Sequence, residues 1–99
     1  MSDAGGNAAP GLLKRTLPIG NKRGLHARAA AKFVRTAGQF DAAVRVSFKG
    51  QEVSGLSIMG LMMLAAGIGS SIDLICSGRQ AGEAMTALAA LVEGKFGED

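Results

Sequence analysis

His26 is the only histidine in this chain, and it stands where a loop of turn residues gives way to a sequence that favours a helix. Gly24 and Leu25 precede it, and Ala27 and Arg28 follow it. The first backbone N–H groups of a helix have no partner within the helix and carry a partial positive charge, so they bind anions readily. An imidazole placed there, with the guanidinium of Arg28 nearby, could accept a phosphoryl group and have the new charge stabilised. The local pattern therefore supports a phosphohistidine.

A single histidine beside glycine and leucine has two other interpretations. A surface or half-buried residue without a chemical role is the commoner outcome for so short a pattern. A metal site requires several His, Cys or carboxylate ligands that converge, and the chain has no second histidine and one cysteine, Cys76. We therefore predict no metal site, while the local residues leave a phosphohistidine and an ordinary histidine both open.

The size and composition of the chain predict one small globular domain. Its 99 residues are 47% apolar, which is typical of a folded chain. We expect residues 1–10 to form a flexible tail and residues 11–99 to form the domain. Cys76 lies in an apolar run and is expected to be a buried thiol, which fits a reducing compartment. No secretory signal and no apolar run of membrane-spanning length are visible, so we expect a cytoplasmic protein without membrane insertion.

The positive charge is concentrated in the first half of the chain. The net charge is +3, but seven of the eleven lysines and arginines fall between Lys14 and Arg35, where there is no Asp or Glu. Such a patch favours acidic or phosphorylated partners and speeds the encounter with them. A small nucleic-acid-binding domain is a third interpretation, but the aromatic residues that stack on bases are scarce, with four Phe and no Trp or Tyr. We therefore expect no nucleic-acid partner.

Hydrophobic periodicity predicts seven elements in the order β-α-β-β-α-β-α. The predicted strands cover residues 12–19, 42–48, 52–54 and 71–77, and the predicted helices cover residues 27–37, 58–65 and 80–94. The second and third strands are joined by a short connection and are expected to form a hairpin. The fold class that follows is α+β, an open-faced sandwich whose four-stranded, mostly antiparallel sheet is covered on one face by three helices.

The helix predicted at residues 27–37 has one apolar and one cationic face. The apolar residues at helical spacing, which we expect in the core, are Ala30, Phe33, Val34 and Ala37. Arg28, Lys32 and Arg35 are expected on the opposite face, where they would either steer partners or serve solubility. Gly38 is expected to end the helix.

Ser57 precedes the second predicted helix and has two interpretations. As an N-cap residue, its hydroxyl would accept a hydrogen bond from the first turn, which stabilises a helix by about 0.5–2 kcal/mol. As a phosphorylation site, it would add negative charge at the start of that helix.

Two segments of the chain resemble one known family. Residues 24–34, Gly-Leu-His-Ala-Arg-Ala-Ala-Ala-Lys-Phe-Val, closely resemble a segment of the histidine-containing phosphocarrier proteins (HPr) of the bacterial phosphotransferase system. Residues 57–64, Ser-Ile-Met-Gly-Leu-Met-Met-Leu, resemble the regulatory-serine segment of that family and lie at the expected distance downstream. The resemblance covers residues 12–96, and residues 94–99 resemble the nitrogen-related branch of the family (NPr). The predicted element order is also that of the family.

The resemblance implies a phosphoryl carrier rather than an enzyme that turns over a small substrate. Enzyme I, charged from phosphoenolpyruvate, would phosphorylate His26 on Nδ1, and His26 would pass the group to an EIIA-type protein. Arg28 and the backbone N–H groups of Ala27 and Arg28 would stabilise the phosphoryl group, and no cofactor is needed. An HPr serine kinase/phosphorylase would act on Ser57. Carriers of this kind usually act as monomers.

The resemblance also implies a docking surface for enzyme I and EIIA beside the histidine. Its predicted residues are Lys32, Arg35, Ile58, Met59 and Met62. Methionines at helical spacing are often core residues, but their flexible side chains also suit a surface that must fit several partners. We expect docking for Met59 and Met62, and core positions for Leu61 and Leu64.

One residue departs from the family pattern, since Ala29 stands where the family usually has proline. Proline pre-sets the backbone of the first helical turn, so we expect altered transfer rates rather than lost function. Sugar transport and nitrogen regulation are both open as the pathway served. The alternative function is a regulatory docking module of the nitrogen-related branch whose phosphorylation state is the signal, and the presence of His26 and Arg28 favours the carrier.

Overall fold

The computed structural model describes residues 12–98, so the tail expected at residues 1–10 lies outside the described residues. The strands are β1 (Leu13–Pro18), β2 (Ala43–Phe48), β3 (Gln51–Ser54) and β4 (Ser71–Ser77). The helices are α1 (Ala27–Ala37), α2 (Ile58–Met63) and α3 (Ala81–Glu93). The predicted order of seven elements is confirmed, and a 3-10 turn, η2 (Lys95–Gly97), that is not among the predicted elements follows α3.

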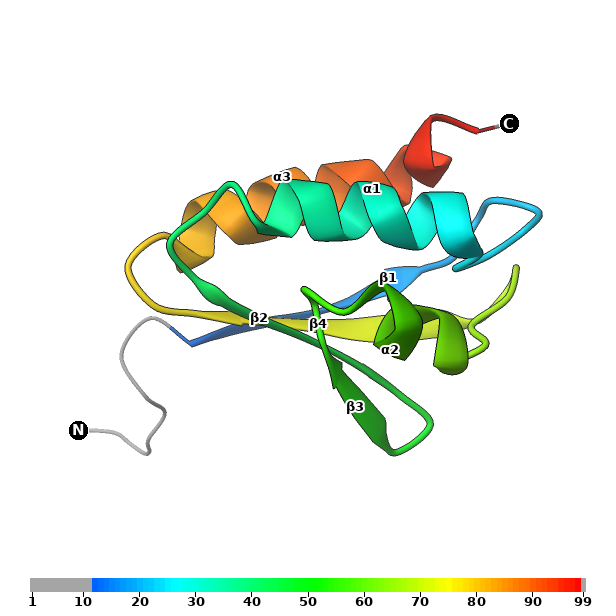
Figure 1. The fold of residues 1–99 in the computed structure, drawn as a ribbon, viewed down its shortest axis with the longest axis horizontal. Helices are drawn as coiled ribbons and strands as arrows, with labels where there is room; N and C mark the ends of the chain where they lie inside the picture. The colour runs from blue at the N-terminus through cyan, green and yellow to red at the C-terminus, as the bar shows by residue number, and fades with distance from the viewer. Residues whose placement is uncertain (1–11, 99) are drawn as a thin grey trace.

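The four strands form one sheet in the order β1-β4-β2-β3. Each pairing among them is antiparallel, and β2 and β3 form the predicted hairpin. Helices α1 and α3 lie side by side over one face of the sheet, and α2 lies beside β3 (Figure 1). The open-faced α+β sandwich is therefore confirmed, with a sheet that is antiparallel throughout.

The core lies between the helices and the covered face of the sheet. Along β4, every second residue faces the helices and is buried, namely Ile72, Leu74 and Cys76. Cys76 is fully buried, as predicted, and this burial raises the pKa of its thiol above the usual value. The core side chains of α3 are Ala81, Ala84, Met85, Leu88, Ala89 and Val92.

Helix α1 buries a face that differs by one position from the predicted one. Ala30, Phe33 and Ala37 are buried as expected, whereas Val34 is half-buried and Ala29 is fully buried. Gly38 follows the last helical residue, as predicted, but it keeps a right-handed φ of −68°. The helix tightens here through hydrogen bonds from Gln39 and Phe40 to residues three positions back.

Helix α2 ends at Met63, two residues before the predicted end at Ala65. The physical reason lies in the backbone of Ala65, whose left-handed φ of 57° cannot continue a right-handed helix. The remaining predicted bounds agree with the structure to within one residue at each end, as is usual for fraying element ends.

Candidate functional site

His26 occupies the N-cap position of α1. Its backbone is extended, with φ −75° and ψ 178°, and its C=O accepts the first helical hydrogen bond from the Ala30 N–H at 2.9 Å. The N–H groups of Ala27, Arg28 and Ala29 therefore precede the hydrogen-bond ladder of the helix. The imidazole accepts no capping hydrogen bond from this turn. The histidine ring therefore lies at the start of a helix, and the first N–H groups of that helix donate no hydrogen bond to the ring.

The Nε2 atom of His26 contacts the carboxyl group of Glu98. The distance from Nε2 to Glu98 Oε2 is 2.5 Å, and the two side chains are only 14% and 18% exposed. An ionised carboxylate can only accept a hydrogen bond, so Nε2 must carry the proton in this contact. The lone pair of the neutral ring then lies on Nδ1.

Glu98 is held in place by a side chain from the loop before α1. Asn21 is fully buried, and its Nδ2 donates to the Gly24 C=O at 2.9 Å and to Glu98 Oε1 at 3.1 Å. The hydrogen bond that Glu98 accepts from Asn21, followed by the one that it accepts from His26, lowers the pKa of Glu98 below its usual value. The carboxyl group is therefore ionised throughout the neutral range.

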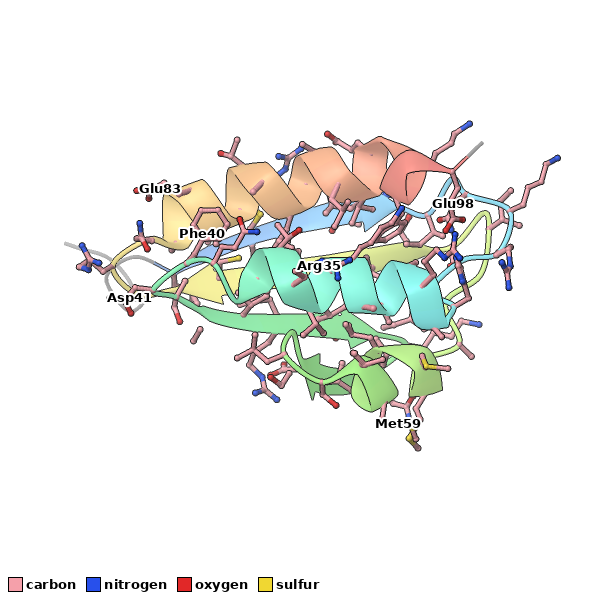
Figure 2. All side chains as sticks on the ribbon, turned by 45° about the horizontal axis from the view of Figure 1, so that its top comes forward. Arg35, Phe40, Asp41, Met59, Glu83 and Glu98 are labelled. Carbon is pink, nitrogen blue, oxygen red and sulfur yellow. The ribbon has the colours of Figure 1, made fainter. Side chains whose placement is uncertain are left out.

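The C-terminal turn brings Glu98 to the histidine. Figure 1 shows the red end of the chain above the first turn of α1, and Figure 2 shows Glu98 at that same end of the helix. Phe96 is fully buried, and the Nζ atom of Lys32 donates to its C=O at 2.6 Å. These contacts connect segments that are 64 to 77 residues apart in the chain.

A cationic pocket of about 400 Å³ lies beside Glu98. Its lining residues are Lys22, Arg23, Arg28, Lys32, Gly97 and Glu98. Arg28 is exposed, as predicted, whereas Lys32 is half-buried because it reaches back to the C-terminal turn. Lys22 and Arg23 belong to the cation-rich stretch of the sequence but carry no motif that would single them out. Arg28 and Lys32 are therefore together at this site, with one carboxylate among four cations.

Arg35 does not share this pocket. It lies nine residues after His26 on α1, which corresponds to about 14 Å along a helix. Figure 2 shows it well along α1 from the end at which Glu98 lies. The predicted cationic stripe is therefore present on the helix, but only its first two members line the pocket.

Helix α2 presents an exposed apolar surface near the histidine loop. Of the predicted docking residues, Ile58, Met59 and Met62 are exposed, with Met59 at 68% (Figure 2), and so are Leu56 and Met63. Leu61 and Leu64 are buried, as predicted. Helix α2 packs on α1, and the Leu25 N–H donates to the Ala66 C=O at 3.0 Å. Helix α2 and the residues that follow it are therefore in direct contact with α1 and with Leu25, the residue that precedes His26.

Ser57 caps α2, as predicted. Its Oγ accepts a hydrogen bond from the Gly60 N–H at 2.9 Å, and its backbone is extended. The capping role therefore holds independently of any modification of this serine.

Two further observations concern metals and membranes. Within residues 12–98, no group of three or more His, Cys, Asp or Glu side chains could hold a metal ion. In the same part of the chain, no helix has both the length and the apolar character needed to cross a bilayer.

Asn21, Phe96 and Glu98 are site residues that sequence reasoning missed. The sole signal was the resemblance of residues 94–99 to the nitrogen-related branch, which does not say where that segment lies in space. The contact between His26 and Glu98 spans 72 residues, and no local periodicity reports on such a pairing.

Comparison with known proteins finds matches to one family of phosphocarrier proteins. The family model for the PTS HPr component phosphorylation site matches residues 13–94. The chain is 52% identical over 87 residues to phosphocarrier protein HPr of Cupriavidus necator, a match that covers 88% of this chain and 98% of that protein. It is 43% identical over 86 residues to phosphocarrier protein NPr of Shewanella violacea, with 87% and 94% covered.

A solved structure also matches the fold. The crystal structure of HPr-C-His from Thermoanaerobacter tengcongensis has a TM-score of 0.84 and 42% sequence identity, and the match covers 88% of this chain and 98% of that one. With the fold, a histidine at a helix start and a family match over nearly the whole described chain, this protein belongs to the HPr family, the phosphocarrier proteins of the bacterial phosphotransferase system.

Proposed function

We propose that this protein carries a phosphoryl group on Nδ1 of His26, accepting it from enzyme I and delivering it to an EIIA-type protein. The observation that carries the proposal is the state of the imidazole. Nε2 is hydrogen-bonded to Glu98, which leaves the lone pair on Nδ1, and the ring stands at the N-terminus of α1. Membership of the phosphocarrier family supports the same assignment.

The chemistry needs one nucleophile and a set of anion-binding groups. The Nδ1 lone pair forms a bond to phosphorus while the bond from phosphorus to the donor breaks and its electron pair stays with the donor. The proton stays on Nε2, so the ring becomes a cation beside the Glu98 carboxylate. The N–H groups of Ala27 and Arg28 and the guanidinium of Arg28 bind the phosphoryl oxygens. A hydrogen bond to a charged group contributes about 1.5–3 kcal/mol, which orients the group without trapping it.

The test is incubation of the protein with enzyme I and radiolabelled phosphoenolpyruvate. We expect one acid-labile, base-stable phosphate per chain. Absence of label, with an enzyme I that phosphorylates a known HPr, would overturn the carrier and favour a docking module of the nitrogen-related branch.

In a gel shift at low salt we expect no retardation of nucleic acid, and retardation would support the nucleic-acid interpretation instead.

Arg28→Ala is expected to slow phosphoryl acceptance by roughly tenfold to a hundredfold, because it removes one charge-assisted hydrogen bond to the phosphoryl group. The stability of the protein should change little, since Arg28 is exposed. Rapid-quench measurement of labelling by enzyme I would give the rate. Arg79→Ala is the control, because it removes the same charge from an exposed position outside the pocket and outside the proposed docking surface. Equal rates for the two variants would mean that Arg28 acts only through long-range charge.

We also propose that Ser57 is a regulatory phosphorylation site of a serine kinase/phosphorylase. Its hydroxyl lies at the start of α2, beside the exposed Ile58 and Met59. Two negative charges there would oppose the docking of an acidic partner through like-charge repulsion and would charge an otherwise apolar surface.

Ser57→Asp is therefore expected to weaken the binding of enzyme I by at least about tenfold, since like charges across an interface cost on the order of several kcal/mol. Isothermal titration calorimetry would measure this affinity. Ser57→Asn is the matched control, because asparagine caps a helix as well as serine does but adds no charge. An equal loss of affinity in both variants would show that the charge is not the cause.

The docking surface we propose for enzyme I and EIIA comprises Ile58, Met59 and Met62 of α2 with Lys32 and Arg35 of α1. Its support is the exposure of the three apolar residues and the packing of α2 on α1.

We expect a cytoplasmic monomer. The uncovered face of the sheet is compatible with this state, because polar contacts cross it, such as Thr16 to Asp73 at 2.7 Å and Arg45 to Glu52.

A further inference from the structure

We propose that Met59 and Met62 of α2 are oxidation sites, at which a peroxide converts the thioethers to sulfoxides and thereby weakens the docking of enzyme I. The proposal rests on the docking surface proposed above and adds a redox input to it. Both side chains are reached from water without any change in the fold, since Met59 and Met62 are exposed on α2.

The first argument is that the methionines are gathered on one short helix. Three of the five methionines of the chain, Met59, Met62 and Met63, lie within the six residues of α2. Their exposed fractions are 68%, 38% and 74%, whereas Met85 of α3 is 5% exposed. Oxidation follows exposure, so the methionines of α2 are open to an oxidant in solution and Met85 is protected by the core.

The second argument is that other oxidisable side chains are missing or shielded. The chain has no Trp, no Tyr and a single cysteine. Cys76 is fully buried, and burial raises the pKa of its thiol, so little of the reactive thiolate forms. The sulfur of a thioether reacts without losing a proton. Among the described residues, the methionines of α2 are therefore the groups that a peroxide meets first.

The reaction is the transfer of one oxygen atom from hydrogen peroxide to sulfur. A lone pair of the methionine sulfur attacks a peroxide oxygen, the O–O bond breaks, and the other oxygen leaves as hydroxide. The hydroxide takes the proton of the transferred OH group and becomes water. Sulfur is thereby oxidised by two electrons to the sulfoxide, and the peroxide is reduced by two electrons. Methionine sulfoxide reductases reverse the oxidation.

The third argument is that a sulfoxide removes the property on which docking here depends. Helix α2 has no acidic residue in its first turn and no basic residue in its last turn. The exposed side chains beside Met59 and Met62 include the apolar Leu56 and Ile58. A sulfoxide is polar, and its oxygen loses free energy when an interface takes it out of water without a hydrogen-bond donor. Oxidation of Met59 and Met62 therefore opposes the burial of this surface by a partner.

Met63 provides a comparison on the same helix. It lies outside the proposed docking surface and lines a groove of about 280 Å³ with Gln51 and Val53 of β3. Its exposure is similar to that of Met59. We therefore expect Met63 to be oxidised about as fast as Met59, but with little effect on the binding of enzyme I.

The first measurement follows the oxidation of each sulfur in the full chain. The folded protein is treated with hydrogen peroxide, and peptide mass spectrometry follows the gain of one oxygen atom at each methionine and at Cys76. We expect Met59 and Met63 to react at least about tenfold faster than Met85, with Met62 between them. In urea the difference should disappear. Equal rates at Met59 and Met85 in the folded protein would overturn the proposal.

The second measurement is isothermal titration calorimetry with enzyme I before and after the peroxide treatment. We expect the Kd of the wild-type protein to rise by roughly tenfold and to fall again after treatment with methionine sulfoxide reductases. Met63→Leu should respond as the wild type does. The double variant Met59→Leu/Met62→Leu should show no response, because leucine has nearly the volume of methionine and no sulfur. Each protein is compared with its own untreated sample, since Met59 and Met62 belong to the docking surface.

Three results would contradict the proposal. A response of the double variant equal to that of the wild type would place the effect at another group, such as Cys76. An unchanged Kd in a wild-type protein that is oxidised at Met59 and Met62 would show that the sulfoxides do not matter for docking. Unfolding of the treated protein, followed by circular dichroism, would show that the loss of affinity is not local to α2.

Failure of the docking function itself gives a different result. In that case the untreated protein does not bind enzyme I, and the proposal fails together with the docking surface. If the proposal alone is wrong, the untreated protein binds enzyme I and peroxide leaves the Kd unchanged or changes it equally in the double variant.

Discussion

His26→Ala is expected to abolish phosphoryl acceptance while the protein keeps its fold. The chain has no second histidine, so no other imidazole can take over as the nucleophile. The ring makes no capping hydrogen bond to α1, and the N-cap role of this residue rests on its backbone. Its removal leaves Glu98 with the hydrogen bond from Asn21, so no buried charge is left without a partner.

The measurement is labelling by enzyme I and radiolabelled phosphoenolpyruvate, with thermal unfolding followed by circular dichroism. We expect no detectable label, against one phosphate per chain in the wild type, and a melting temperature within a few degrees of the wild type. Label on a folded His26→Ala protein would contradict the assignment of the nucleophile. An unfolded variant would contradict the structural part of the prediction.

Gly24→Ala is expected to destabilise the protein by about 3–5 kcal/mol, the range of severe steric and packing changes in a core. Gly24 has a φ of +63°, and a Cβ atom added there would lie 2.4 Å from the Ala66 carbonyl oxygen and 2.8 Å from Gly67 Cα. Both are backbone atoms that cannot rotate away. The shift needed to relieve this contact would also break the hydrogen bond from the Leu25 N–H to Ala66 and displace the loop that carries His26.

Gly50→Ala separates the steric contact from backbone strain in this prediction. Gly50 is also left-handed, with a φ of +81°, but a Cβ atom there would meet nothing within 4 Å. The left-handed conformation alone costs about 1–2 kcal/mol for a residue with a side chain, so the control should lose only that much. Urea denaturation of both variants gives the two values. Equal losses would mean that the approach of the backbone at Ala66 is not tight.

Ala29, which stands where the family usually has proline, lies in the first turn of α1. It is fully buried, and its N–H group precedes the hydrogen-bond ladder of α1. The alanine therefore neither loses nor gains a helical hydrogen bond relative to the proline that the family usually has. That Ala29 alters the transfer rates stays a prediction, and its physical basis is the lower stiffness of the first helical turn without proline.

The sequence by itself determined the elements, most of the core and the position of His26 at the start of a helix. Alternation along residues 71–77 and helical spacing along residues 27–37 are local patterns, because the pleat of a strand and the turn of a helix set them directly. The same locality explains why the N-cap role of Ser57 and the place of His26 at a helix start were predictable. The predicted core face of α1 was wrong by one position, at Val34, and the predicted end of α2 was wrong by two positions, at Ala65. Neighbours in space rather than in sequence decide burial and helix length at these positions.

Only the tertiary structure decided the surroundings of the histidine. Asn21 and Glu98 are polar residues without local periodicity, and their meeting depends on a turn in which Lys95 and Phe96 adopt left-handed backbone that their residue types disfavour. Packing of Phe96 into the core and the hydrogen bond from Lys32 select that turn. These contacts join α1 to residues more than 60 positions away, and because burial, not local propensity, selects them, no pattern in the linear chain reveals them.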